Sequence, residues 1–261
     1  MPSVVLVAPT FFKGVDEARF ILTVKACQDA AARGLPMILV DASDDAIRAT
    51  LAASGAHVVQ QSGKGRKGVA LREAIQLAIT LHGASDPVIA FFEPEKAGIV
   101  AHVVAAAAHL RAQSLDVVVP CRDDALFRET YPIEQYHQER FANLLIDTLA
   151  TKRGFPAGLD WTFGPVCFRA GLASHWTQYN GELWDAQVVP YVRAVLWHGA
   201  RVGSYTVPYA HAEQMKREEE NHFAWAKKRF DQLSLWVATL PPELHAETDP
   251  SSSPSVISQT Q

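Results

Sequence analysis

The segment Val88-Ile-Ala-Phe-Phe-Glu-Pro-Glu-Lys-Ala-Gly-Ile99 decides the predicted fold. Its first five residues are apolar, a run that is long enough for a buried strand and too short for a helix. A strand covered on both faces needs no alternation of polar and apolar residues, so this run is typical of the centre of a parallel sheet. Pro94 has no backbone donor and should end the strand. Glu93 and Glu95 are therefore expected at the carboxyl end of a central strand, where open α/β sheets bind their ligands.

Strands and helices are expected to alternate along the first half of the chain. Apolar runs predict further strands, and helical spacing of apolar residues predicts the segments between them. This alternation gives right-handed crossovers and an α/β fold, with a Rossmann-like, mostly parallel central sheet flanked by helices. The predicted strands are 3–8, 36–40, 56–60, 88–92 and 116–120, the first and last ending at prolines, and the predicted helices are 16–32, 46–54, 69–81 and 98–113.

The second half is expected to complete one domain. We expect a single domain over 1–240, with a nucleotide-binding half (1–120) and an acceptor and metal half (121–240). Residues 241–261 are low in complexity and are predicted to be a disordered tail. The predicted elements are helices 133–150, 183–198 and 215–240, a strand within 161–169 and a strand over 201–207. The apolar stripe of the last helix, predicted to pack inward, is Phe223, Ala226, Phe230, Leu233 and Trp236.

Composition narrows the class of protein. The chain of 261 residues is 48% hydrophobic and 20% charged, which is typical of a soluble globular protein. Its net charge of −4 argues against a general nucleic-acid coat. Cys27, Cys121 and Cys167 form no close pair and no metal-ligand spacing, which indicates buried thiols in a reducing compartment. Because we find neither a signal peptide nor a membrane-spanning run, we expect a cytoplasmic protein without a membrane partner.

Other strand ends should open on the same edge of the sheet as the glutamate pair. Pro9-Thr10 and Asp41 follow the first two strands, and the glycine-rich segment 62–68 follows the third. Its glycines would let the backbone approach an anion, and Lys64, Arg66 and Lys67 add positive charge. The segment does not match a Walker loop, and taken on its own it slightly favours a flexible basic turn over an anion site. For Asp41, ligand contact and a structural role remain open, whereas Asp44 and Asp45 fit a helix N-cap.

Two downstream residues could join this edge. Asp185 falls in the first turn of a predicted helix, where an aspartate can be only a dipole partner. His211 follows the last predicted strand, and a lone histidine is more often structural than a ligand. Together with strand-end carboxylates, however, an imidazole makes a mixed oxygen and nitrogen site that suits Mn²⁺ or Mg²⁺. The alternative for the glutamate pair is an acidic loop beside Lys96.

Three stretches carry a resemblance to a known family. They are 63–68 before a helix, Phe91-Phe-Glu-Pro-Glu95 in the place of an Asp-x-Asp motif, and Trp184-Asp185 followed by Tyr209-Ala-His211. With them, the sequence resembles glycosyltransferases of the GT-A (nucleotide-diphospho-sugar transferase) fold, and among these the mannosylglycerate synthase type. The resemblance covers about residues 4–216. It departs from the family where glutamate replaces aspartate at both acidic positions.

The resemblance implies a role for each matched residue. Glu95 and His211 would bind Mn²⁺ or Mg²⁺, and Glu93 would lie against the sugar or ribose of the donor. Lys64 would contact the diphosphate of a nucleoside-diphosphate sugar, and Asp185 would lie at the acceptor hydroxyl or the donor sugar. Residues 161–166 would form the loop at the reacting centre. The predicted catalytic residues are Glu93 and Asp185, the metal ligands Glu95 and His211, and the donor-binding residues Pro9, Thr10, Asp41, Lys64, Arg66 and Glu93.

Three functional hypotheses follow. The first is a metal-dependent glycosyltransferase that moves a sugar from a nucleoside-diphosphate sugar to a small-molecule acceptor; the family leans to retention of configuration, which the sequence does not fix. The second is the same scaffold used for aminoacyl-tRNA-dependent synthesis of small peptides, with Glu93 and Glu95 as acid and base. The third is a non-catalytic nucleotide-sugar binder. Only the second involves nucleic acid, and the oligomeric state, homodimer included, stays open.

One further group of polar residues has two interpretations. Gln135, Glu139 and Asn143 recur on one face of the helix predicted over 133–150. A solvated helix face is the default interpretation. Because the helix follows a strand end, a wall of an acceptor site is the alternative.

Overall fold

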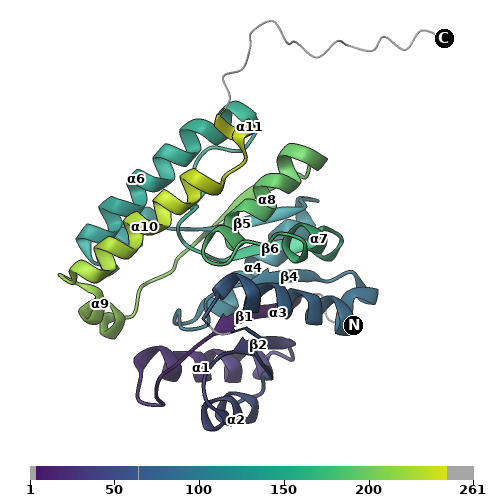
Figure 1. Cartoon of the computed structure of the whole chain (residues 1–261), viewed down its shortest axis with the longest axis vertical. Coiled ribbons are helices and arrows are strands. Elements are labelled where there is room, and N and C mark those ends of the chain that lie inside the picture. Colours follow the sequence, from purple (N-terminus) through teal and green to yellow (C-terminus); the bar gives the residue numbers. More distant parts are fainter. Residues whose placement is uncertain (1–3, 64, 246–261) are drawn as a thin grey trace, which may run out of the picture.

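The described residues of the computed structural model, 4–63 and 65–245, form one seven-stranded sheet with the order β3-β2-β1-β4-β6-β5-β7 (Figure 1). Neighbouring strands are parallel, except that β6 runs antiparallel to β4 and to β5. The predicted α/β class and the mostly parallel sheet are therefore confirmed. The strands are β1 (Val4–Thr10), β2 (Met37–Asp41), β3 (His57–Gln60), β4 (Val88–Phe91), β5 (Val117–Arg122), β6 (Val166–Arg169) and β7 (Val202–Val207).

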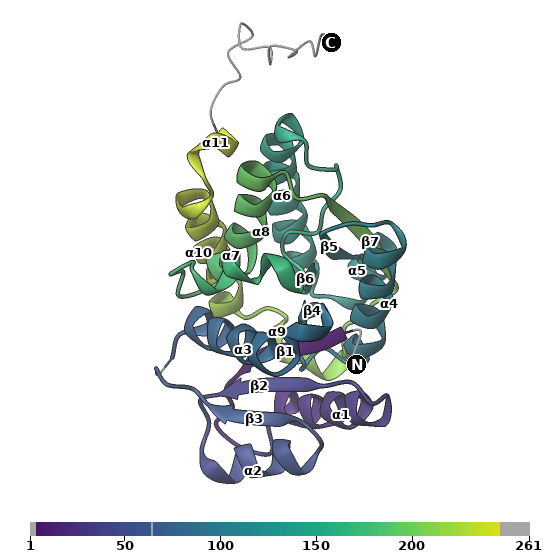
Figure 2. The same cartoon turned by 90° about the vertical axis from the view of Figure 1, so that its right-hand side faces the viewer.

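Helices cover both faces of the sheet, and a pair of long helices stands beside one end of it (Figures 1 and 2). Helices α3, α7 and α8 share a core with one face, and α1 and α4 share a core with the other. Helices α6 and α10 lie side by side. The helices are α1 (Ala18–Ala32), α2 (Asp45–Ala53), α3 (Lys67–His82), α4 (Ile99–Ala112), α5 (Asp124–Thr130), α6 (Ile133–Ala150), α7 (Ala173–Thr177), α8 (Asp185–His198), α9 (Glu213–Glu219), α10 (Phe223–Thr239) and α11 (Pro242–His245).

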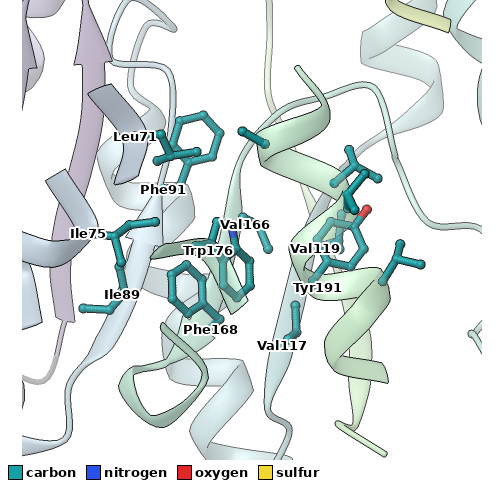
Figure 3. Close-up of a cluster of buried hydrophobic side chains, with 14 of the residues drawn as sticks. Leu71, Ile75, Ile89, Phe91, Val117, Val119, Val166, Phe168, Trp176 and Tyr191 are labelled. Atoms are coloured by element: carbon teal, nitrogen blue, oxygen red, sulfur yellow. The ribbon is translucent and has the colours of Figure 1, made fainter. Parts of the chain in front are cut away.

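The sequence of β4 is apolar without a break because the strand is buried on both faces of the sheet. Ile89 and Phe91 point into the core beneath α3, whereas Val88, Ala90 and Phe92 pack into the core on the opposite face. Figure 3 shows the first of these cores, where Phe168 stacks on Trp176 with ring centroids 3.7 Å apart. Fully burying such a side chain stabilises the fold by about 1.5–3 kcal/mol. The packing on both faces fixes the point at which the chain leaves the sheet before Glu93.

The strand order brings distant segments to one edge of the sheet. The order reverses between β1 and β4, and ligands of open α/β sheets bind at such a switch point, outside the carboxyl ends of the strands. Strands β4, β5 and β7 all end on this edge, and antiparallel β6 begins there. The segments after 91, after 122 and after 207, together with the segment before 166, are thus placed next to one another.

Two strand ends differ from the prediction. Strand β1 continues through Pro9 to Thr10, and β5 continues through Pro120 to Arg122. Each proline lies where its strand has a single neighbour, since the pairing of β1 with β4 stops at Val7 and the pairing of β5 with β6 stops at Val118. A residue with a neighbour on one side only can lack a backbone donor without losing a ladder hydrogen bond.

The C-terminal helix also differs from the prediction. The expected single helix over 215–240 is two helices, α9 and α10, with Asn221 in the left-handed region (φ 59°) between them. Trp236 is buried, but Phe223 and Phe230 of the predicted inward stripe are exposed, so that part of the prediction is wrong. The tail expected to be disordered from 241 begins with helix α11, and 246–261 lie outside the described residues. Within the described ranges, no helix has the length and apolar character needed to cross a bilayer.

Candidate functional site

A polar cavity of about 100 Å³ lies at this edge of the sheet. Its walls come from segments that are far apart in the sequence, which is what the strand order predicts. Helices α6, α9 and α10 form a large part of the remaining wall and add more charged side chains than apolar ones, and α1 and α8 contribute Arg19 and Gln187. The polar lining includes Glu93, Glu95 and Lys96 after β4, Thr162 before β6, Tyr209 and His211 after β7, and Gln135, Glu139, Glu219, Lys228 and Arg229 from the helices.

Glu93 is held between two ammonium groups. Its Oε1 accepts a hydrogen bond of 2.7 Å from Lys67 Nζ, and its Oε2 lies 3.2 Å from Lys96 Nζ. Burial alone would raise the pKa of the Glu93 carboxyl, but Lys67 and Lys96 outweigh burial and hold it well below its usual range. Gly164 has a φ of +106°, and a Cβ there would lie 3.0 Å from Glu93 Oε2. Glycine at 164 therefore gives Glu93 the space in which it meets both lysines.

Lys96 and Lys228 differ in their partners. Lys96 Nζ pairs with Glu93 and lies 5.1 Å from the ring centroid of Phe163. Lys228, on α10, makes no hydrogen bond or ion pair with any residue in the described ranges, and its Nζ lies 4.5 Å from the Trp225 ring centroid. Burial lowers the pKa of the Lys228 ammonium to about 8. The cavity therefore contains a cation that has no anionic partner in direct contact.

His211 reaches the cavity as the sequence predicts, and its contacts there are with Tyr131 and Glu219. Its ring stacks on Tyr131 with centroids 4.2 Å apart, and its Nε2 lies 3.6 Å from Glu219 Oε2, which is longer than a hydrogen bond. Burial lowers the pKa of His211, so the imidazole is neutral at pH 7. Glu219 is itself paired with Arg19 at 2.7 Å.

Several buried polar atoms around the cavity have no hydrogen-bond partner among the described residues. They are Tyr131 Oη, Gln187 Nε2, Arg229 Nη1 and both ring nitrogens of His211. All four side chains line the same cavity. Leaving one such group unpaired costs about 1–3 kcal/mol, so a concentration of them in one place indicates a site for a polar ligand. Most of these atoms are donors, which favours a ligand rich in oxygen acceptors.

A buried charge cluster supports the wall formed by α6. Arg122, at the end of β5, donates to Asp160 Oδ2 at 2.7 Å and to Glu139 Oε2 at 2.7 Å. Gln135 Nε2 donates to Glu139 at 2.7 Å, and Asn143 Nδ2 donates to Asp160 at 2.9 Å. Burial would raise the pKa of Asp160, but Arg122 lowers it to about 2. The solvated helix face predicted for Gln135, Glu139 and Asn143 is therefore wrong, and the first two line the cavity instead.

The residues predicted to bind the donor are not all in this cavity. Thr10 Oγ1 donates to Asp41 Oδ2 at 2.7 Å, and Asp41 is fully buried and also accepts from Ser43 N at 2.7 Å. Arg66 forms an ion pair with Glu182 on the surface. Pro9, Thr10, Asp41 and Arg66 lie outside the cavity lining. Lys64 lies outside the described residues, so its predicted contact has no structural counterpart here.

Asp185 is also kept apart from the cavity. It stands at the start of α8, and its carboxylate accepts hydrogen bonds from Tyr179 Oη at 2.9 Å and Leu183 N at 3.0 Å. Its helix neighbours Trp184 and Gln187 line the cavity, whereas Asp185 lines a separate surface pocket.

A hydrogen bond from Ile47 N at 2.9 Å confirms the N-cap prediction for Asp44.

The metal site implied by the resemblance does not fit the residues present. Both oxygens of Glu93 already face ammonium groups, and His211 is stacked on Tyr131. Across the described part of the chain, no group of three or more histidine, cysteine, aspartate or glutamate side chains is placed to hold a metal ion. A cation brought to within about 4 Å of each lysine would meet a repulsion of about 4 kcal/mol per pair of unit charges at an effective dielectric constant of about 20. The predicted Glu95–His211 metal site is therefore not carried into the reaction proposed below.

Comparisons with known proteins support the fold. No protein-family profile matches the chain, and no curated protein sequence does either. A solved structure described as a mycobacterial protein matches with a TM-score of 0.60 and 15% identity over 92% of this chain and 76% of that one. Glucosyl-3-phosphoglycerate synthase of M. tuberculosis matches with a TM-score of 0.59 and 12% identity over 95% and 82%.

A third solved structure that matches is mannosyl-3-phosphoglycerate synthase of Rubrobacter xylanophilus. It matches with a TM-score of 0.55 and 14% identity over 98% of this chain and 78% of that one. At identities this low, the TM-scores show that these proteins share a fold with this chain, and they show nothing further. The chain has the GT-A fold, as the resemblance implies.

The sequence did not single out several residues of the cavity. The sequence does contain a sign of the role of Lys96, because this residue lies three positions after Glu93, close enough to form an ion pair in a turn. Lys228 had none, since it stands between Lys227 and Arg229 in a charged helix. Tyr131 and Gln187 become notable only through their unpaired polar atoms.

Proposed function

We propose that this protein transfers a glycosyl group from a nucleoside-diphosphate sugar to a small acceptor. The observation that carries the proposal is the cavity outside the carboxyl ends of β4 and β7 in a GT-A sheet, which is lined by two strand-end carboxylates and by polar atoms that have no partner among the described residues. Two proteins of similar fold are named as enzymes that glycosylate a small phosphorylated carboxylic acid, which supports the same class of reaction here.

The proposed reaction exchanges one bond to the anomeric carbon for another. The bond from this carbon to the phosphate oxygen breaks, and its electron pair leaves with the nucleoside diphosphate. A new bond forms to the acceptor hydroxyl oxygen, and the hydroxyl proton passes to a base. Glu95 suits this role because it lines the cavity and makes no hydrogen bond or ion pair within the described ranges. Glu93, which stays ionised between its lysines, would instead accept hydrogen bonds from the hydroxyl groups of the sugar.

The acceptor is proposed to carry a carboxylate or phosphate beside its hydroxyl. Tyr131 Oη, Gln187 Nε2 and Arg229 Nη1 are buried in the cavity wall without a partner in the part of the chain that the structure describes, and each can donate to an anionic oxygen. Charge-assisted hydrogen bonds of this kind are about twice as strong as neutral ones. An acceptor that satisfies them would be fixed in orientation as well as bound.

Donor binding is proposed to move α9 and α10. The cavity of about 100 Å³ is smaller than the roughly 300–1,000 Å³ typical of ligand pockets, so it cannot enclose a whole nucleotide sugar. Helix α10 packs on α6 and α8 along its length. At α9 and the start of α10, Arg19 pairs with Glu219 and lies 4.6 Å from the Trp225 ring, and Asn221 N donates to Glu134 at 2.8 Å. These are the contacts that would break and reform during donor binding.

Turnover with labelled donors tests the proposal. UDP-sugars and GDP-sugars are incubated with the protein and a panel of small hydroxy acids that includes 3-phosphoglycerate, and product and free nucleoside diphosphate are measured. We expect transfer with at least one pair, and loss of transfer with retained donor binding in Glu95→Gln. Donor binding without transfer or hydrolysis for any pair would instead indicate a binding module. Absence of binding by every nucleotide would contradict the proposal.

The tRNA-dependent alternative has no comparable support. A tRNA backbone would need free cations, but in the glycine-rich segment 62–68 Arg66 pairs with Glu182 and Lys67 pairs with Glu93. Both cations are therefore turned toward carboxylates of the protein itself. No specific observation favours this second function.

A further inference from the structure

The cavity contains positive charge in the place where the resemblance implies a metal ion. Lys67 and Lys96 contact the two oxygens of Glu93, at 2.7 Å and 3.2 Å, and Lys228 lines the same cavity from α10. Counted against Glu93 and Glu95, these three ammonium groups leave a surplus of one positive charge. The same two carboxylates with a divalent cation would leave none. The lysines thus supply at least as much positive charge as the metal would.

The three lysines are held in position by different means. Lys67 is the first residue of α3, a helix of 16 residues that packs on the sheet. Lys96 lies in the loop that follows β4, and its side chain is 15% exposed and lies over the Phe163 ring. Lys228 projects between Trp225 and Trp184, with its Nζ 4.5 Å and 6.0 Å from the two ring centroids. Side chains fixed in this way are preorganised to meet charge that develops on a ligand.

Lys228 adds the observation that points to an anionic ligand. It is partly buried and has no carboxylate within ion-pair distance among the described residues. Its neighbour Lys227 is exposed and pairs with Asp231 at 2.6 Å, which is the usual arrangement on a helix surface. Placing an ammonium in a cavity without a counter-ion costs free energy, and a bound anion removes that cost.

We propose that Lys67, Lys96 and Lys228 neutralise the departing diphosphate, so that transfer needs no divalent cation. This inference rests on the proposed function. As the bond from the anomeric carbon to the phosphate oxygen breaks, its electron pair stays on the diphosphate, and the added negative charge is stabilised by the three ammonium groups. Glu93 keeps two of these groups in place until the phosphates arrive. No metal ion enters the step.

Binding measurements on the full chain test the inference apart from turnover. The rise in Tm produced by UDP, GDP and inorganic pyrophosphate is measured in EDTA and again in MnCl₂, and the free Mn²⁺ signal is followed by electron paramagnetic resonance as protein is added. We expect at least one diphosphate to stabilise the protein equally in both buffers. We also expect the Mn²⁺ signal to stay unchanged by protein without nucleotide.

Variants decide which groups carry the effect. Lys96→Met and Lys228→Met should each weaken diphosphate binding in EDTA at least tenfold, Lys96→Arg should restore most of it, and Lys227→Met should bind within twofold of the parent. The Tm of each variant without ligand controls for folding. Stabilisation that requires Mn²⁺, or unchanged binding by both methionine variants, would overturn the inference and leave the proposed function standing. No stabilisation by any diphosphate in either buffer would overturn both.

Discussion

Two charge clusters lie at the same edge of the sheet, one after β4 and one at the end of β5, and they differ in how completely their groups are paired. In the Arg122 cluster, the guanidinium contacts Asp160 and Glu139, and these in turn accept from Asn143 and Gln135. In the cavity cluster, Glu93 is paired with Lys67 and Lys96, but Lys228 has no anionic partner in the described chain. The two clusters also differ in their exposure to solvent. The Arg122 side chain is 1% exposed, whereas the Glu93 side chain in the cavity cluster is 23% exposed.

The difference separates a structural role from a ligand-binding role. A buried network in which every member is satisfied makes the surroundings rigid and fixes one arrangement of the elements. A network with unpaired donors keeps a cost that a ligand can remove. The Arg122 cluster therefore positions α6 and the segment before β6, and the cavity cluster is the one that we propose to meet a ligand.

The largest expected effect is the loss of Arg122. Arg122→Met leaves Asp160 and Glu139 buried without their cation, and breaking a buried pair in this way costs about 3–5 kcal/mol. Urea denaturation should show that loss in the free energy of unfolding. Arg140→Met is the matched control, because Arg140 pairs with Asp124 at 3.4 Å while more than half exposed, and such surface pairs contribute about 0–1 kcal/mol. Equal losses of stability in the two variants would contradict the structural role of the Arg122 cluster.

A smaller effect is expected when the cavity cluster loses its carboxylate. Glu93→Gln leaves Lys67 and Lys96 without a counter-ion, and because the site is partly solvated the expected loss is about 1–3 kcal/mol. Here a ligand should compensate: pyrophosphate at about one hundred times its Kd restores about 2.7 kcal/mol. The same addition should not restore Arg122→Met beyond what it gives the parent protein. Thermal denaturation with and without pyrophosphate measures both, and failure of pyrophosphate to raise the Tm of Glu93→Gln would count against an anion site.

The pH dependence of anion binding reports on Lys228. Its pKa of about 8 means that the ammonium loses its proton as pH rises from 7 to 9, and the affinity for pyrophosphate should fall about tenfold over that range. The groups that face Lys228 electrostatically are Glu93, Arg19, Lys67 and Glu219. Calorimetric titration at several pH values measures the fall, and Lys228→Met should flatten it.

The stability of the free protein should change in the opposite direction. The pKa of Lys228 in the folded protein is below its value of about 10.4 in the unfolded chain, so the unfolded chain binds more protons between these values. The contribution of Lys228 to the free energy of unfolding therefore rises as pH increases from about 8 to about 10.4. A stability curve that is identical for the parent and Lys228→Met across this window would contradict the low pKa.

The fold could be predicted because its signals are local. The unbroken apolar run at 88–92 required burial on both faces, and the alternation of strands and helices required parallel crossovers. The prediction also brought Glu93, Glu95 and His211 to one cavity, because parallel strand ends share an edge. It ended β1 and β5 too early, since whether a strand tolerates a proline depends on how many neighbours it has at that residue, and this is known only from the sheet order.

The pairing of charges could not be predicted from the sequence. Glu93 looked like a free carboxylate because its partner Lys67 is 26 residues away, and Glu139 looked solvated because Arg122 reaches it across 17 residues. Asp185 looked available for the same reason, since Tyr179, which donates to it, lies in an irregular segment whose path the sequence pattern does not give. Side-chain partners depend on tertiary packing, which is not encoded in the period of the apolar residues.

The smallest effect is expected at Asp185, which the sequence had placed beside the reacting groups. Asp185→Asn keeps an oxygen for the hydrogen bond from Leu183 N, and its amide can donate to the hydroxyl of Tyr179, so the loss in stability should stay below about 1 kcal/mol. Because Asp185 lies outside the cavity, pyrophosphate affinity and transfer rate should change less than twofold. Transfer assays on this variant beside Glu95→Gln make the comparison direct. A large loss of transfer in a stable Asp185→Asn protein would mean that the acceptor extends from the cavity into the pocket around Asn180, and that the reacting site is wider than the cavity cluster.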